Sequence, residues 1–204
     1  MAQTFAEIET ETLSLQLPGN LALHVTPQQF ERLAAANKDL RLERTAQGEL
    51  IANPPASWET GERNCSLTGQ VYRWHEENDN LGKVFDSSAG FTLPNGAIRS
   101  PDASWVSQER WDALTPEQKK TFPIICPDFV VELRSRSDSL KSVQEKMKEY
   151  MENGAKLGWL LDPQHRRVEI YRPKLAVEVL ENPPSVSGGE VLPGFELNLR
   201  RVWG

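Results

Sequence analysis

The sequence has few residues of the kinds that build metal fingers or disulfide frameworks. Its 204 residues include two cysteines and three histidines, and they match no Cys-x-x-Cys or histidine metal spacing. This scarcity argues against a structural zinc site and against a disulfide-built secreted domain. We therefore expect Cys65 and Cys126 to be two buried free thiols in a reducing compartment.

Long apolar runs and an excess of basic residues are also missing. No apolar stretch approaches the roughly 18 residues that span a bilayer, and residues 1–19 lack a basic segment followed by an apolar one. We therefore expect a cytoplasmic protein without a membrane partner. The net charge is −6, whereas proteins that bind nucleic acid broadly usually have a basic surface. A nucleic-acid function must then depend on a local site.

The length and the order of elements predict one α/β domain. The chain is long enough for one sizeable core and short for two. Helices are expected at 27–37, 59–78 and 139–153. Strands are expected at 13–17, 21–25, 39–52 (two strands around Gln47-Gly48), 82–93, 97–106, 128–134, 156–162 and 166–172. This order is typical of an α/β sandwich with a central mixed sheet.

Three local signals refine this outline. Asn95-Gly96 predicts a hairpin between the strands at 82–93 and 97–106. Thr115, followed by proline, predicts the start of a short helix. The last apolar segment, 191–203, is expected to add an edge strand.

Two Pro-Asp dipeptides stand where strands are expected to begin. Because proline is excluded from the middle of a sheet, Asp102 and Asp128 lie near strand beginnings. Glu132 follows in the second strand, between Val131 and Leu133. Burying its carboxylate is costly unless a metal cation, a lysine or an arginine balances the charge. An ion pair or a solvated face is therefore the alternative to a metal site.

The helix expected after this strand carries a lysine beside its apolar stripe. The stripe consists of Leu140, Val143, Met147, Tyr150 and Met151. At about 100° per residue, Lys146 lies next to the stripe, where its ammonium can point toward the strand. Lys148 lies off the other edge, and a lysine beside a core often only packs its stem there. Periodicity therefore leaves both lysines, and a purely structural role, open.

The stretch with the most specific pattern is 127–173. It resembles the Uma-two family of restriction-endonuclease-like proteins, in the PD-(D/E)XK nuclease superfamily. Residues 84–106 and 53–62 are similar to the same family, so the resemblance covers about 20–175. It implies a single restriction-endonuclease-like domain over the whole chain, residues 1–204. The domain would have a central mixed β-sheet flanked by helices and a C-terminal extension at 176–204.

The resemblance also implies roles for individual residues. Asp102 and Glu132 resemble the metal-binding carboxylates, and Lys146 resembles the catalytic lysine, moved from the strand to the following helix. Glu62 resembles the helix carboxylate that many superfamily members add to the site. Leu133 stands where relatives offer a backbone carbonyl to the metal. The implied cofactor is Mg²⁺, with Mn²⁺ as a substitute.

The chain departs from the superfamily pattern at Arg134, which stands where the lysine usually sits. Arginine keeps its proton near neutral pH and cannot act as a general base, but it could hold a phosphate as an accessory group. Arg136 and Lys141 are candidate contacts to a nucleic-acid backbone. An ordinary solvated face is the alternative for all three.

These features predict a Mg²⁺-dependent endonuclease that hydrolyses the DNA backbone and leaves a 5′-phosphate. The cation would lower the pKa of a bound water, and the lysine would orient that water or stabilise negative charge. A homodimer follows by analogy with small superfamily members. One alternative is a catalytically inactive binding or assembly module, whose carboxylates pair with Arg134 or Lys146. Another is a metal-dependent phosphohydrolase acting on a small nucleotide.

Overall fold

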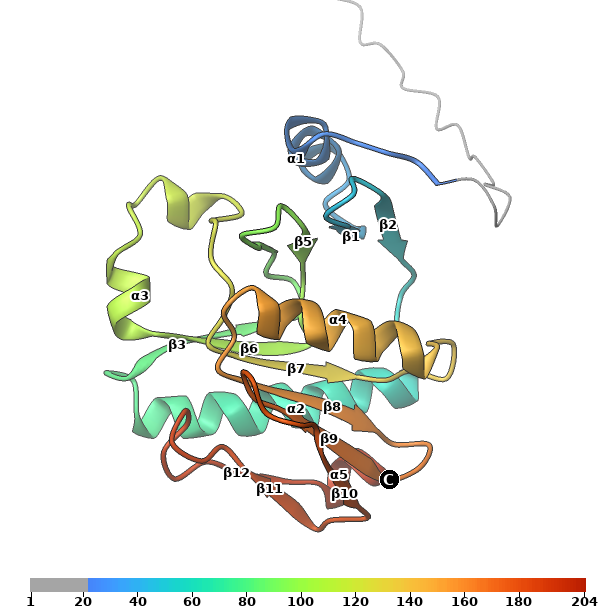
Figure 1. The fold of residues 1–204 in the computed structure, drawn as a ribbon, viewed down its shortest axis with the longest axis vertical. Helices are drawn as coiled ribbons and strands as arrows, with labels where there is room; N and C mark the ends of the chain where they lie inside the picture. Colours follow the sequence, from blue (N-terminus) through green and yellow to red (C-terminus); the bar gives the residue numbers. More distant parts are fainter. Residues whose placement is uncertain (1–21) are drawn as a thin grey trace, which may run out of the picture.

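A six-stranded mixed sheet lies at the centre of the fold, which a computed structural model describes over residues 22–204 (Figure 1). The strand order is β10-β9-β8-β7-β6-β3, with β7 and β8 parallel and the other neighbours antiparallel. The strands are β3 (Gly82–Asp86), β6 (Ala103–Ser107), β7 (Phe129–Leu133), β8 (Leu157–Asp162), β9 (Arg167–Tyr171) and β10 (Glu178–Glu181). The predicted α/β fold with a central mixed sheet is confirmed.

A smaller sheet of order β2-β1-β5-β4 stands beside the central one. Its strands are β1 (Arg41–Arg44), β2 (Leu50–Asn53), β4 (Phe91–Thr92) and β5 (Ile98–Arg99). The predicted hairpin around Asn95-Gly96 forms here, between β4 and β5. The long strands expected on either side of it are each divided. Asp86 accepts the Ser88 N–H in a tight turn at 2.9 Å, and Pro101 has no N–H to continue a ladder.

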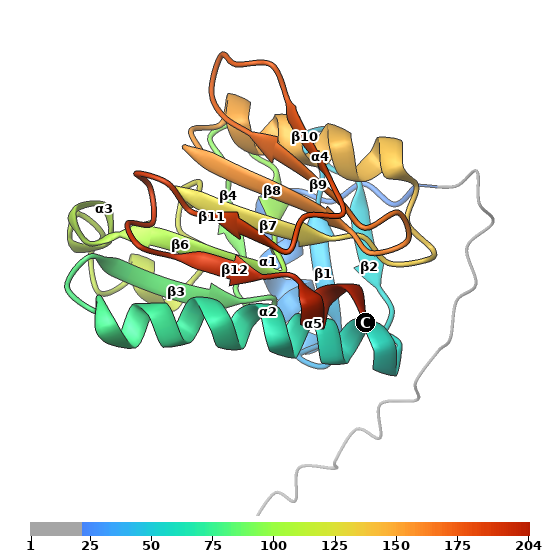
Figure 2. The same ribbon diagram turned by 90° about the horizontal axis from the view of Figure 1, so that it is seen from below.

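Two long helices cover opposite faces of the central sheet (Figures 1 and 2). One face packs against α4 (Leu140–Glu152), which buries Met147 and Tyr150. The other face packs against α2 (Trp58–Glu77), which buries Leu67, Val71 and Trp74. The other helices are α1 (Pro27–Ala36), α3 (Gln108–Asp112), the 3-10 helix η1 (Gln118–Lys120) and α5 (Arg200–Trp203). The short helix expected after Thr115 is therefore the single 3-10 turn η1.

The C-terminal segment completes the core beneath α2. In it, β11 (Ser185–Ser187) and β12 (Glu196–Asn198) pair antiparallel, and α5 follows. Leu197, Leu199 and Val202 are fully buried in the same cluster as the α2 stripe. The strand expected near the C-terminus is thus β12, and it pairs with β11 rather than with the edge of the central sheet.

Three smaller expectations have different outcomes. The strand expected at 13–17 lies outside the described residues, and the one at 21–25 is reduced to a single bridge between His24 and Glu49. Both cysteines are free, but only Cys126 is buried. Cys65 is exposed because it lies two residues before Leu67, about 200° around α2 from the buried stripe. Within residues 22–204, no helix has the length and apolar character to cross a bilayer.

Candidate active site

Asp102 and Glu132 are brought together beside the end of β7. The backbone N–H of Asp102 donates to the Val131 carbonyl at 3.0 Å. Its side-chain Oδ2 accepts the Leu133 N–H at 2.8 Å. Asp102 is therefore bound to both neighbours of Glu132 in the sequence. Each of the two carboxylates is 6% exposed, and both line one cleft of about 730 Å³.

The side chain of Glu132 points to the face of the sheet that α4 covers. Its Oε1 accepts the Tyr150 O–H at 2.8 Å and lies 2.9 Å from Nζ of Lys146. Tyr150 and Lys146 are four residues apart and share one side of the helix. Lys148, in contrast, is exposed. The structure thus separates the two lysines that periodicity left open, because Lys146 reaches Glu132.

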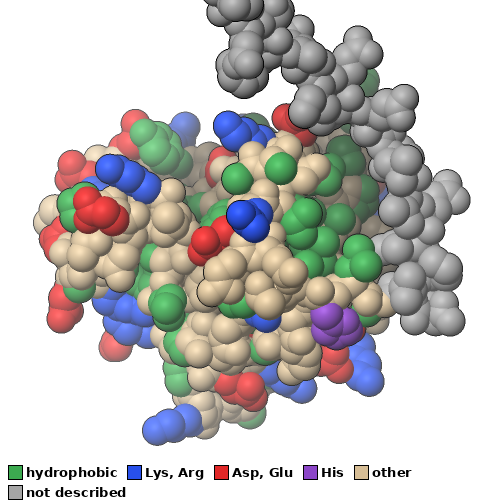
Figure 3. All heavy atoms as spheres, turned by 90° about the horizontal axis from the view of Figure 1, so that it is seen from above, with side chains coloured by type: hydrophobic (Ala, Val, Ile, Leu, Met, Phe, Trp, Pro, Cys, Tyr) green, Lys and Arg blue, Asp and Glu red, His purple; other side chains and the backbone are tan. Residues whose placement is uncertain are grey.

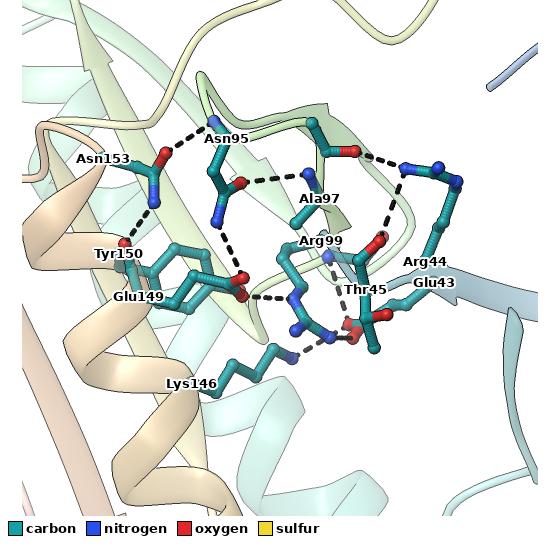
Figure 4. A network of polar contacts seen from close by, with 12 residues as sticks. Glu43, Arg44, Thr45, Asn95, Ala97, Arg99, Lys146, Glu149, Tyr150 and Asn153 are labelled. Atoms are coloured by element: carbon teal, nitrogen blue, oxygen red, sulfur yellow. Dashed lines mark hydrogen bonds and ion pairs between the residues drawn. The ribbon is translucent and has the colours of Figure 1, made fainter. Parts of the chain in front are cut away.

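A third carboxylate enters the cleft from β1, and the sequence analysis missed it. Glu43 is 3% exposed, and its Oε1 lies 2.9 Å from Nζ of Lys146. The same oxygen accepts the Ser100 N–H at 3.1 Å, and Oε2 lies 3.4 Å from Nη1 of Arg99. In Figure 4, Lys146 from α4 and Arg99 from β5 converge on Glu43. The cleft therefore joins the small sheet to α4 through charged groups.

Arg41, also on β1, lies beside Asp102. Its Nη1 is 3.1 Å from Oδ1 of Asp102, and its Nη2 donates to the Ser100 carbonyl at 2.6 Å. Each of the two predicted metal-binding carboxylates therefore has a positive partner in the protein itself. Arg41 fills this role for Asp102, and Lys146 fills it for Glu132.

Burial and neighbouring charges shift the acid–base behaviour of the cleft. Burial has the largest effect on the pKa of Glu132 and raises it. Lys146 lowers the pKa, whereas the carboxylates of Asp102 and Glu43 raise it further. The resulting pKa is about 7. For Glu43, the attraction of Lys146 and Arg99 outweighs burial and lowers the pKa. For Lys146, burial is likewise outweighed, and its two carboxylate partners raise the pKa of the ammonium.

The raised pKa of Glu132 predicts a pH-dependent stability of the metal-free protein. The folded state holds a proton that the unfolded chain has released above its ordinary pKa of 4.5. The contribution of this bound proton to the free energy of unfolding is therefore present at low pH and is lost as the pH rises through about 7. Between pH 5 and pH 8 the free energy of unfolding of the wild type should fall by on the order of 3 kcal/mol relative to that of Glu132→Gln. Urea unfolding with a chelator at each pH measures this difference, and a constant difference would contradict the prediction.

The donor groups in the cleft suit a small, hard cation. No group of three His, Cys, Asp or Glu side chains within the described part of the chain has the spacing of a metal site. A cation here would therefore have two carboxylates, from Asp102 and Glu132, and would keep several water ligands. Mg²⁺ is usually bound in this way, through one or two carboxylates and water.

Glu62, predicted as an accessory carboxylate, is not in the cleft. It is exposed, and the α2 residues that line the cleft are Thr60 and Asn64. Glu62 is two residues from each of them, so it lies about 160° away around the helix axis. The helix therefore turns Glu62 away from Asp102, and the third carboxylate of the cleft is Glu43.

Arg134 ties together the ends of β7 and β8 instead of lining the cleft. Its Nη1 donates to Oδ2 of Asp162 at 2.8 Å, and its Nε donates to the Asp138 carbonyl at 3.2 Å. The Asp162 side chain is 1% exposed. Although burial opposes it, hydrogen bonds from His165 and Arg134 lower the pKa of Asp162. These contacts do not leave Arg134 in position to hold a phosphate in the cleft.

An Arg134→Ala substitution should therefore reduce stability rather than DNA affinity. The loss is expected to be about 2 kcal/mol, because Asp162 stays buried without its guanidinium partner and keeps only its contacts with His165 and the Gln164 N–H. Urea unfolding measures it, and Arg172→Ala is the matched control, since Arg172 pairs with Glu178 on the exposed surface. Unchanged stability together with weaker DNA binding would restore the phosphate role.

The two predicted backbone contacts differ in their relation to the cleft. The Arg136 side chain lines it, is 81% exposed and lies 3.3 Å from Glu59. The Lys141 side chain is 85% exposed, does not line the cleft, and lies 3.8 Å from Glu145. On the face seen in Figure 3, the coloured acidic and basic side chains are interspersed. Contacts to a nucleic acid would therefore be local, as the net charge indicated.

Comparisons with known proteins agree with this architecture. The fold is similar to a crystal structure described as a "putative nuclease belonging to DUF820" from Anabaena variabilis ATCC 29413. The TM-score is 0.67 at 20% identity, over 79% of this chain and 89% of that chain. No protein among those with curated descriptions matches. The model of the Uma2 family, described as "Putative restriction endonuclease", matches residues 27–200. The chain therefore belongs to the Uma2 family, with a nuclease-like fold.

Proposed function

We propose that this protein is a Mg²⁺-dependent endonuclease that hydrolyses the DNA backbone and leaves 5′-phosphate ends. The observation that carries the proposal is the meeting of Asp102 and Glu132 in one cleft, with Lys146 at 2.9 Å from Glu132. Membership of the Uma2 family supports a nucleic-acid substrate. Metal-assisted hydrolysis explains why a site for an anionic substrate would contain carboxylates.

The proposed metal ligands are Asp102, Glu132 and the backbone carbonyl of Leu133. Leu133 lines the cleft, and its N–H donates to Asp102. Its carbonyl points to the same side of β7, because the N–H and C=O of one strand residue point the same way. When bound, Mg²⁺ or Mn²⁺ would supply an activated water and offset the charge of the scissile phosphate.

Lys146 would stabilise negative charge that develops on the phosphate. Its two carboxylate partners raise the pKa of the ammonium, so it stays protonated and is a poor proton acceptor near neutral pH. A fixed cation aimed at a low-dielectric cleft is an effective way to stabilise a transition state. Of the two roles that the sequence suggested, orienting the water or stabilising negative charge, the protonated ammonium supports the second directly.

DNA would approach the cleft from the side of Arg136. This residue lines the cleft and is largely exposed, so it can contact a backbone phosphate at small cost. Lys141 lies outside the cleft, so it would contact the DNA backbone only at phosphates further from the site of cleavage. Cutting both strands of a duplex needs two active sites, and a homodimer is therefore part of this proposal.

A second candidate function is a non-catalytic binding or assembly module. The ion pairs favour it, since Asp102 is already bound by Arg41 and Glu132 by Lys146. The net charge of −6 favours it as well. In that case the carboxylates would be structural, and a divalent cation would have to displace two protein cations to bind.

Cleavage of supercoiled plasmid tests the first function. Nicked and linear products should form with Mg²⁺ or Mn²⁺, disappear with a chelator, and carry 5′-phosphates that a ligase can seal. Calorimetric titration with Mn²⁺ separates the two candidates. A folded protein that neither binds Mn²⁺ nor cuts DNA would favour the module.

A further inference from the structure

Lys146 lies between two carboxylates rather than beside one. Its Nζ is 2.9 Å from Oε1 of Glu132 and 2.9 Å from Oε1 of Glu43. The two acids come from different sheets, since Glu132 belongs to β7 and Glu43 to β1. The ammonium of Lys146 therefore links the central sheet to the small sheet through these two carboxylates.

Glu43 is also fixed by groups other than Lys146. The Ser100 N–H binds Oε1 at 3.1 Å, and Arg99 lies 3.4 Å from Oε2. Arg99 is in turn held by Glu149 of α4, with 2.7 Å between its Nε and Oε2 of Glu149 (Figure 4). The position of Glu43 is thus set by β5 and α4 together, and it does not depend on Glu132.

A cation bound to Glu132 would compete with Lys146 for that carboxylate. Both are positive, and they would share the same buried oxygen atoms. Lys146 would then keep only one acidic partner, Glu43. Without that partner, the ammonium would be repelled toward the open part of the cleft.

We propose that Glu43 is a positioning residue that holds Lys146 in the cleft when a divalent cation occupies Glu132. The inference rests on the proposed function, because it takes Asp102 and Glu132 as the metal ligands. It assigns Glu43 no contact with the metal or the DNA. Glu43 acts only through Lys146, and the network of Arg99 and Glu149 keeps it in place.

The reactivity of Lys146 toward an amine reagent tests the positioning role of Glu43 without a measurement of DNA cleavage. Trace labelling with acetic anhydride, read by peptide mass spectrometry, gives the ratio of Lys146 to exposed Lys148. In the wild type the ratio should stay low with or without Mn²⁺. In Glu43→Gln, Mn²⁺ should raise it several-fold. An equal ratio in the two proteins, with Mn²⁺ bound by calorimetry, would overturn the inference.

Steady-state kinetics give a second measurement. Glu43→Gln should lower kcat by about 10–100-fold with little change in KM or in Mn²⁺ affinity, and Glu43→Asp should recover part of the loss. Glu31→Gln is the matched control, with the same charge change at an exposed position of α1 outside the cleft. A large loss of Mn²⁺ affinity in Glu43→Gln would overturn the positioning role, because Glu43 would then act as a ligand.

The two proposals fail in different ways. If calorimetry detects no binding of Mn²⁺ to the wild type and the wild type does not cleave DNA, the proposed function is overturned, and so is the role of Glu43. If the wild type binds Mn²⁺ and cleaves DNA while Glu43→Gln matches it in both kcat and labelling, only the role of Glu43 is overturned.

Discussion

The Glu132→Gln protein is expected to cleave DNA more slowly than the wild type, by a factor on the order of 10²–10³. Glutamine keeps the size of the side chain and can still accept the Tyr150 O–H. It removes the negative charge that would hold the cation. The loss should therefore appear both in kcat and in the Mn²⁺ affinity measured by calorimetry.

Glu169→Gln is the matched control for this substitution. Glu169 is 3% exposed and lies in the same row across the sheet, since Leu160 pairs with both Glu132 and Glu169. Its carboxylate binds Gln144 and Tyr171 and does not line the cleft. Cleavage per folded molecule should be unchanged in this control. Equal losses in both variants would mean that Glu132 acts through stability alone.

The Lys146→Met protein should lose both activity and stability. Methionine keeps an unbranched stem of similar length but removes the ammonium from two buried carboxylates. Loss of one partner of a buried ion pair destabilises by about 3 kcal/mol, and cleavage should fall on the order of 10²-fold or more.

A divalent cation should restore part of the stability of Lys146→Met. The cation would replace the missing positive charge beside Glu132, and a ligand that binds only the folded state raises stability by mass action. Thermal unfolding with increasing Mn²⁺ measures this gain, which should be larger than in the wild type. A variant that stays as stable and as active as the wild type would contradict both roles assigned to Lys146.

Five of the six strands of the central sheet were predictable because their signals are local, whereas β10 was not expected. The run from Phe129 to Leu133 is apolar except for Glu132 and comes shortly after a proline. The helix that carries Lys146 follows it and has a regular apolar stripe. Asp102 and Glu132 could be paired in advance only through the family resemblance. The structure adds that the Asp102 side chain binds the Leu133 N–H, which no sequence pattern expresses.

Glu43 could not be found in the same way. The strand Arg41–Arg44 has three charged residues and one apolar residue, like a solvated edge. One of its two neighbours in the sheet, β5, lies more than 50 residues further along the chain. Contacts with residues distant in the sequence, such as Lys146, which is 103 residues away, show that Glu43 is buried in the cleft. The one local signal was a carboxylate flanked by arginines one and two residues away, and ordinary surface strands show it too.

The packing of the C-terminal segment could not be predicted for a similar reason. Residues 183–189 are rich in proline, serine and glycine, which are typical of loops. The apolar side chains that follow, such as Leu192 and Phe195, are nevertheless buried against α2 and β8. Their partners are distant in the sequence, so short-range patterns carry no information about this packing.

A crystal soaked in Mn²⁺ tests the central claim most directly. An anomalous difference map should show one peak about 2.1 Å from a carboxylate oxygen of Asp102 and of Glu132, with Lys146 still in contact with Glu43. No peak between these carboxylates at saturating Mn²⁺, with the ion pairs of Arg41 and Lys146 unchanged, would contradict the metal site and the enzyme built on it.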